Sequence, residues 1–156
     1  MGVFMQTIGI RVEPSTITFV IYDSEAENLV NAEILKVPKA LTIPESLKYV
    51  RVSIIDILRE YQIDRAGIRV TESTAQSTSI SRIQIEAIII EAFASSSLEK
   101  YFCGQISTIS RLVGIDRADF KKYVNGEMDY AVVDNWSEFS KVAKEACFAA
   151  IGATNA

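Results

Sequence analysis

The sequence predicts a single α/β domain, built on a mixed five-stranded sheet that is flanked by helices. Three short segments with strand character come first, and short polar connections join them. Longer segments with helical spacing then alternate with two further short strands, which favours parallel pairing for the later part of the sheet. The chain has 156 residues, 49% of them hydrophobic, which suits one domain with a sizeable core.

The first three strands are expected to form an antiparallel meander. Ile8, Ile10 and Val12 alternate with polar or small residues, which is the two-residue period of a strand. Residues 16–22 are rich in β-branched and aromatic side chains, and a third strand at 29–37 follows a polar turn. Connections this short join antiparallel neighbours.

The segment that follows predicts a long helix. Thr42 and Glu45 have the spacing of a capping box, and Pro44 falls in the first turn, where its missing N–H costs nothing. Apolar residues at helical spacing define one buried stripe: Leu47, Val50, Ile54, Ile57, Leu58 and Tyr61. A fourth strand at 67–72 follows this crossover helix, so it should run parallel to the first strand.

The segment 79–94 predicts a helix that is apolar on nearly every side. Its apolar character is interrupted by Arg82, Gln84, Glu86 and Glu91. A helix of this kind needs cover on more than one face. The cover could come from the sheet of the same chain or from a second copy, so burial within the monomer and a homodimer contact both stay open.

The last third of the chain predicts a short strand near 102–107, a compact helical region that ends at Gly126, and a closing helix from Trp136 to Ile151. One face of the closing helix carries Phe139, Val142, Ala143, Ala146 and Ala150. The tail, residues 152–156, is expected to be loose.

Composition excludes several kinds of chemistry. The chain has no histidine, which excludes histidine bases and histidine metal ligands, and Cys103 and Cys147 lack the spacing of a zinc site. The net charge of −4 gives no general attraction to phosphates, so any nucleic-acid contact must come from a local basic patch. No stretch is apolar enough to span a membrane, and without a signal peptide the expected compartment is the cytoplasm.

The order of elements, with the meander first, resembles the RNase H-like superfamily and, within it, the branch of the RuvC-like Holliday junction resolvases. The resemblance rests on Ile8-Gly9-Ile10 at the opening of the first strand, on Glu72 at the end of the fourth, and on the alanine-rich closing helix. It covers most of the chain and implies the RNase H-like fold. In active members, clustered carboxylates hold two divalent ions, usually Mg²⁺, for phosphodiester cleavage.

The resemblance also indicates where the acids should lie. Glu72 matches the acid at the end of the fourth strand, although a solvated glutamate at a strand end is the simpler alternative. The family has an aspartate in the first strand where this chain has Arg11. Glu13 faces the same way two residues further on, about 6–7 Å along the strand.

The closing helix also departs from the family pattern of two acids spaced three residues apart. One alignment puts Val142 and Glu145 at these positions, and the neighbouring alignment puts Lys141 and Lys144 there. At most one acid remains in either case. The site is therefore expected to be degenerate, without a bound metal.

Electrostatics leads to a hypothesis for Arg11. Two unit charges about 4 Å apart interact by about 4 kcal/mol at an effective dielectric constant near 20, so a fixed arginine repels a divalent ion by roughly twice that. We therefore expect Arg11 to take the place of the metal and to pair with Glu72 on the adjacent strand. The alternative is that Arg11 turns to solvent.

Residues 106–126 look like a helix-turn-helix. Gly114 falls where the turn needs a left-handed residue, Asp116 can cap the second helix, and Asn125 with Gly126 can end it. In this interpretation four basic side chains face DNA: Arg111, Arg117, Lys121 and Lys122. The alternative is a purely structural pair of helices whose lysines form a solvated face.

Three functions follow from these observations. The leading hypothesis is an RNase H-like protein with a degenerate metal site and no cofactor, which binds nucleic acid or a protein partner without catalysis. The second is a Mg²⁺-dependent, structure-selective endonuclease that uses Glu72, Glu145 and Glu13. The third is a dimeric scaffold or regulatory subunit that acts through helix 79–94.

Overall fold

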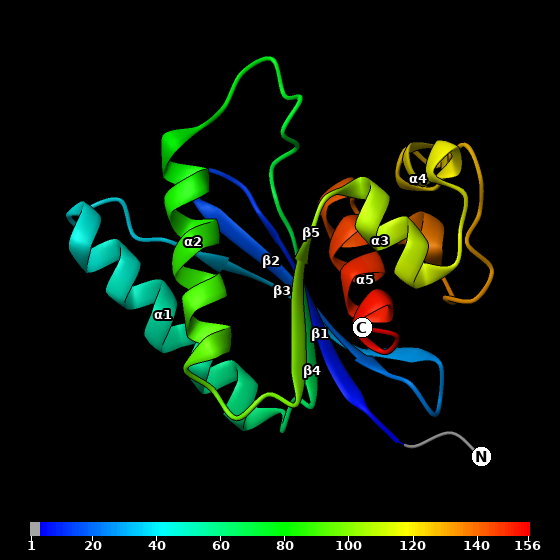
Figure 1. Ribbon diagram of the computed structural model, residues 1–156, viewed down its shortest axis with the longest axis horizontal. Coiled ribbons are helices and arrows are strands. Elements are labelled where there is room, and N and C mark those ends of the chain that lie inside the picture. Colours follow the sequence, from blue (N-terminus) through cyan, green and yellow to red (C-terminus); the bar gives the residue numbers. More distant parts are fainter. Residues whose placement is uncertain (1–3) are drawn as a thin grey trace.

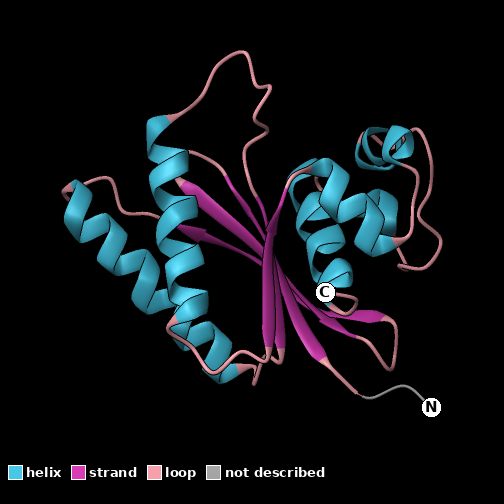
Figure 2. Cartoon of the chain, viewed as in Figure 1, coloured by secondary structure: helices cyan, strands magenta, loops and turns pink. Residues whose placement is uncertain are grey.

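The protein is a five-stranded sheet between two layers of helices, as Figure 1 and Figure 2 show for the computed structural model, which describes residues 4–156. The strand order is β3-β2-β1-β4-β5. β1, β2 and β3 pair antiparallel, whereas β4 runs parallel to both β1 and β5. The strands are β1 Gln6–Val12, β2 Thr16–Asp23, β3 Asn28–Lys36, β4 Arg65–Arg69 and β5 Lys100–Gly104. The predicted mixed sheet with its meander is confirmed.

Two helices, α1 (Ile43–Glu60) and α2 (Ile80–Ala94), cover one face of the sheet (Figure 1). The other face carries α3 (Ile106–Val113), α4 (Arg117–Val124), a short 3₁₀ turn η1 (Trp136–Glu138) and α5 (Lys141–Ala153). Each layer has its own apolar core, so the central strands β1, β2 and β4 are mostly buried.

The predicted capping box begins α1. The Thr42 hydroxyl accepts from the backbone N–H of Glu45 over 3.4 Å, and the Glu45 carboxylate accepts from the backbone N–H of Thr42 over 2.9 Å. Of the predicted apolar stripe, Val50, Ile54 and Leu58 are buried against the sheet. This packing places the meander and α1 in one core.

The alanine-rich helix α5 lies directly on β1, β2 and β4. A Cβ atom on Gly9 in β1 would lie 1.8 Å from the carbonyl oxygen of Ala146 and 2.3 Å from the backbone nitrogen of Ala150. Because only glycine allows an approach this close, Gly9 and the small residues of α5 are two sides of one contact. The contact sets how closely the second turn of α5 can approach the sheet.

Two predicted strands were misplaced. The fourth strand ends at Arg69 rather than at Glu72, because the backbone N–H of Thr71 donates to the carboxylate of Glu86 instead of to a neighbouring strand. The fifth strand was expected near 102–107 but spans Lys100–Gly104, and α3 begins at the next residue but one. Glu72 therefore lies in the loop after β4.

The closing helix begins at Lys141 rather than at Trp136. The Ser140 hydroxyl accepts from the backbone N–H of Ala143 and caps α5, while Trp136 belongs to the separate turn η1. The tail is also not loose, since Ala153 is buried and the Asn155 side chain donates to the carbonyl oxygen of Leu112 over 2.8 Å.

Helix α2 is covered on one face only within the monomer. Ile85, Ile89, Ala92 and Phe93 are buried in the core. On the other face, Ile80 remains 75% exposed and Ile83 44% exposed. Over residues 4–156, no helix is both long enough and apolar enough to cross a membrane.

Candidate functional site

The candidate site is a cluster of two arginines and two glutamates where the carboxyl ends of β1 and β4 meet α5. Arg11 lies near the end of β1 and Arg69 is the last residue of β4. The two strands run parallel, with Arg11 directly beside Arg69 in the register. Glu145 on α5 and Glu72 in the loop after β4 complete the cluster. We call these four residues the arginine–carboxylate cluster.

Arg69 is the centre of the cluster. Its Nε donates to Glu145 Oε1 over 3.1 Å, and its Nη1 lies 3.1 Å from Glu72 Oε2. The other oxygen of Glu145 lies 3.3 Å from Nε of Arg11. Arg11 also donates to the backbone carbonyl of Arg69 over 3.2 Å. One guanidinium thus joins two carboxylates that come from different elements.

The hypothesised ion pair between Arg11 and Glu72 is wrong. Among the described residues, no ion pair of 4.0 Å or less joins them; Arg11 pairs with Glu145, and Arg69 pairs with Glu72. The reason is placement, since Glu72 lies past the strand end and within reach of Arg69 three residues earlier. The alternative, in which Arg11 turns to solvent, is also wrong because its side chain is only 12% exposed.

Glu72 has a second role at the start of α3. Its Oε2 accepts from the backbone N–H of Ile106 over 3.0 Å. Gln105, at the N-cap position, makes no capping bond with its own side chain. The carboxylate therefore supplies the acceptor that a capping side chain usually provides. It lies at the N-terminus of α3, and a helix N-terminus favours negative charge. The cluster and α3 are mechanically linked through this residue.

Burial governs the electrostatics of the cluster. Burial lowers the pKa of the Arg69 guanidinium below its ordinary value, and the positive charge of Arg11 lowers it further. Glu145 and Glu72 oppose this shift. Arginine keeps its charge in proteins, so the cluster holds two positive and two negative charges. Each carboxylate is thereby neutralised within the chain.

The donor set does not fit a catalytic divalent ion. Within residues 4–156, no group of three or more carboxylate, cysteine or histidine side chains is placed to hold a metal. The carboxylates of Glu72 and Glu145 are both engaged by guanidinium groups. Mg²⁺ requires several oxygen ligands, and a fixed cation that already pairs with those oxygens both competes for them and repels the ion. We therefore derive no chemical step through a metal.

The other predicted site residues lie apart from the cluster. Glu13 accepts from the hydroxyl of Thr16 over 3.2 Å in the turn between β1 and β2. Lys141 is exposed, and Lys144 is buried with its Nζ 5.9 Å from the ring centre of Trp136. Of the predicted site residues on α5, Glu145 is the one that joins the cluster.

Arg69 was missed by the sequence interpretation. Its only signal was a charged residue at the end of a short apolar strand that was expected to run parallel to the first. Aligning those two strands residue by residue would have placed Arg69 beside Arg11. That alignment needs the register, which hydrophobic patterning alone leaves open.

An open groove of about 560 Å³ lies beside the cluster, between the loop after β4 and the start of α4. Its lining residues are Glu72, Thr74, Ile106, Asp116, Arg117, Ala118 and Lys121. Arg111 and Lys122 are also exposed, although Lys122 lies 3.8 Å from Asp119 in an ion pair. Two of the four predicted DNA-facing residues therefore line the groove next to the cluster.

The turn between α3 and α4 is as predicted at Gly114, which has a φ of 88°. Asp116 occupies the N-cap position of α4, but its side chain makes no capping hydrogen bond. Ile109 and Phe120 are buried in the second core, so the two helices pack through apolar contacts.

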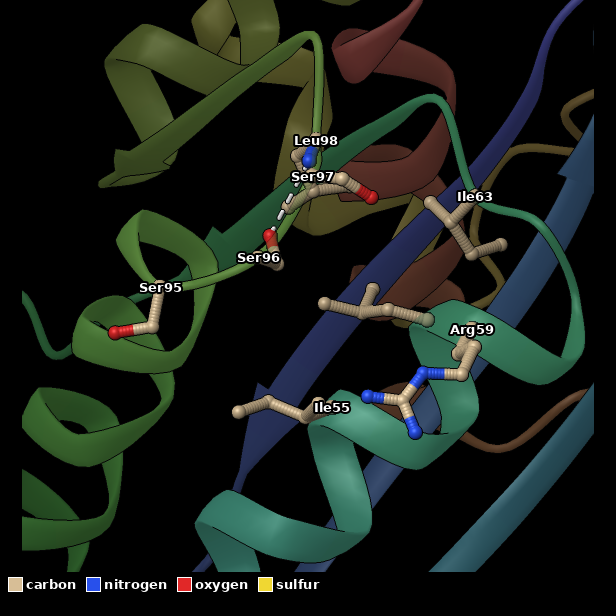
Figure 3. Close-up of a pocket in the computed structure, with 8 residues that line it drawn as sticks. Ile55, Arg59, Ile63, Ser95, Ser96, Ser97 and Leu98 are labelled. Atoms are coloured by element: carbon tan, nitrogen blue, oxygen red, sulfur yellow. Dashed lines mark hydrogen bonds between the residues drawn. The ribbon is translucent and has the colours of Figure 1, made fainter.

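A second hollow of about 240 Å³ lies at the amino ends of β4 and β5, whereas the cluster lies at the carboxyl ends of the strands (Figure 3). Apolar side chains of Ile55, Leu58, Ile63 and Leu98 line it together with Arg59 and the serines 95–97. The Arg59 guanidinium, whose side chain is 78% exposed, lies 3.9 Å from Asp56. This arrangement presents one solvated charge and no reactive group, so the candidate site remains the cluster.

Comparison with solved structures relates this fold to known proteins. Thermus thermophilus RuvC superposes with a TM-score of 0.67 at 9% sequence identity, over 95% of this chain and 92% of that one. The fold is RNase H-like and RuvC-like. T. thermophilus RuvC in complex with a Holliday junction substrate gives the same TM-score at 10% identity, over 95% of this chain and 91% of RuvC. The yeast mitochondrial Holliday junction resolvase Ydc2 matches with a TM-score of 0.61 at 8% identity, over 96% of this chain and 78% of Ydc2.

No protein-family model matches the sequence, and no curated protein matches it. The RuvC-like relationship is therefore one of structure. It confirms the expected RNase H-like fold, and function has to be argued from the residues of this chain.

Proposed function

We propose that this RuvC-like protein binds nucleic acid through the groove beside α4 and does so without metal-dependent cleavage. One observation carries the proposal: a single buried guanidinium, that of Arg69, engages both carboxylates of the cluster. A site whose two carboxylates already pair with arginines offers poor ligands to Mg²⁺ but leaves open the adjacent groove, which Arg117 and Lys121 help to line.

Two basic side chains support nucleic acid as the ligand, although Glu72 and Asp116 line the same groove. The chain as a whole carries −4, yet Arg117 and Lys121 lie four residues apart on α4 and both line the groove. Phosphate contacts from such side chains set the position of a bound nucleic acid. The similar RuvC fold occurs in complex with a Holliday junction substrate, which makes branched DNA the first ligand to test.

The endonuclease alternative needs Glu72, Glu145 and Glu13 to act together on Mg²⁺. Glu13 lies in the β1–β2 turn against Thr16, and the other two acids are paired with arginines. An active metal site would require at least Arg69, which pairs with both acids, to leave. We therefore rank binding above cleavage.

Binding assays with a matched control test the proposal. We expect the wild-type protein to bind a four-way junction equally well in EDTA and in Mg²⁺, and to leave the strands intact. Arg117→Glu/Lys121→Glu should lose this binding. Lys48→Glu/Arg59→Glu makes the same charge change on exposed residues of α1 and should keep it. Strand scission by wild type with Mg²⁺ or Mn²⁺, or equal affinity of the two double variants, would contradict the proposal.

A second function rests on the exposed face of α2. Apolar residues recur there with alternating spacings of three and four: Ile80, Ile83, Ala87, Ile90 and Ala94. This is the pattern of a helix seam that packs against an equivalent helix. We propose a second copy of the chain as the partner for this face.

A further inference from the structure

We infer that Arg69 occupies the place of a bridging cation in this site, so that a divalent ion can bind there only when Arg69 is removed. The inference deepens the proposed function, because it identifies which residue closes the site. It also separates Arg69 from Arg11, which the sequence alone suggested for this role.

The contacts distinguish the two arginines. Arg69 reaches Glu72 through one nitrogen and Glu145 through another, both over 3.1 Å. Arg11 reaches only Glu145, and its remaining contact is with the backbone carbonyl of Arg69. Only Arg69 joins acids from two different elements, as a bridging metal does. Arg11 supports it from the neighbouring strand.

The burial of the acids makes the role of Arg69 testable. The side chains of Glu72 and Glu145 are 20% and 15% exposed, respectively. Without Arg69, both would share a poorly solvated space, and only Glu145 would keep an arginine partner. Two charged carboxylates in that position would repel each other. A hard divalent cation that is coordinated by oxygens of both would relieve this repulsion.

The decisive measurement is thermal unfolding of Arg69→Ala with and without divalent ions. We expect this variant to melt well below wild type in EDTA. Millimolar Mg²⁺, Ca²⁺ or Mn²⁺ should then raise its melting temperature in a concentration-dependent way, because an ion that binds only the native state stabilises it. The wild-type protein should show no such shift.

Three control variants identify the source of the effect. Arg65→Ala removes another part-buried arginine of β4, one that pairs with the single carboxylate of Glu99, and should not respond to divalent ions. Arg11→Ala keeps the bridging guanidinium and should not respond either. Arg69→Ala/Glu72→Gln lacks the second acid and should lose the response.

A second variant guards against failure to fold. Arg69→Gln keeps a polar side chain without the charge, and Tb³⁺ luminescence reports ion binding to it directly. The inference is overturned if neither Arg69 variant gains affinity for a divalent or lanthanide ion, or if Arg11→Ala gains the same affinity. Junction binding by wild type in EDTA is a separate result, so failure here leaves the proposed function standing.

Discussion

A Cβ atom added to Gly9 would lie 1.8 Å from the carbonyl oxygen of Ala146. The backbone of β1 fixes the position of this Cβ atom, and the oxygen belongs to the backbone of α5, so neither atom can rotate away. This contact brings α5 against the sheet and thereby sets the distance between Glu145 and the arginines of β1 and β4.

Gly9→Ala should therefore destabilise the protein strongly. Overpacking of a rigid core contact costs about 3 kcal/mol or more when backbone must move. Gly152→Ala is the matched control, because its nearest neighbour is a side-chain atom of Leu112 at 3.3 Å. We expect the control to stay within about 1 kcal/mol of wild type in urea unfolding. Equal stability of the two variants would show that α5 can shift.

Glu72→Ala should loosen the start of α3. It removes the acceptor for the backbone N–H of Ile106, and loss of a capping acceptor costs about 1 kcal/mol. Hydrogen exchange at the first turn of α3 should accelerate while exchange in α1 stays unchanged. Unaltered exchange at Ile106 would mean that solvent satisfies this N–H as well as the carboxylate does.

Replacing Lys121 with Gln should lower the salt dependence of nucleic-acid binding. Each phosphate contact contributes about 0.9 to the slope of log affinity against log salt for duplex DNA, so loss of one contact should reduce the slope by about one. Lys122→Gln should have a smaller effect, because Lys122 is paired with Asp119. The idea fails if both variants keep the wild-type slope.

Ile83→Glu should abolish self-association if a second copy covers α2. Ile83 is 44% exposed, so the monomer should tolerate the charge, whereas a helix seam should not. Sedimentation velocity would compare it with Val52→Glu, which places the same charge on an exposed apolar residue of α1. A wild-type protein that sediments as a monomer at high concentration would rule out this partner.

Stability should fall at alkaline pH. Burial raises the pKa of Cys147 from 9.0 to about 12, and burial with a smaller contribution from Glu27 raises that of Tyr22 from 10.0 to about 12. Because both groups hold protons more tightly when folded, their stabilisation is complete below about pH 9 and is lost as pH rises toward 12. Each group contributes a slope of up to about 1.4 kcal/mol per pH unit. The free energy of unfolding of Cys147→Ala, measured in urea, should decline less steeply above pH 9 than that of wild type.

Local patterns predicted most of the fold because their causes are local. The capping box at Thr42 and the alternation of Ile8, Ile10 and Val12 depend on neighbours in the chain, and the structure confirms both. The start of the closing helix was misplaced because Trp136 fits the apolar face of a helix. The helix begins only after Ser140, because the hydroxyl of this single residue caps it.

The site was less predictable because its contacts cross the fold. Sequence identified three members of the cluster, Arg11, Glu72 and Glu145, but paired them wrongly. Their partners depend on Arg69, and its position follows from the parallel register of β4 against β1. Such a register is set by packing of the whole sheet rather than by any segment.

The bond from Glu72 to the N–H of Ile106 affects how mutational data on this protein should be interpreted. An alanine at this position removes an acid and also removes the acceptor at the start of α3. A loss of function in this variant would therefore not by itself identify a catalytic group. Glutamine removes the charge and retains an acceptor oxygen. The comparison of Glu72→Gln with Glu72→Ala is therefore the experiment that separates charge from architecture.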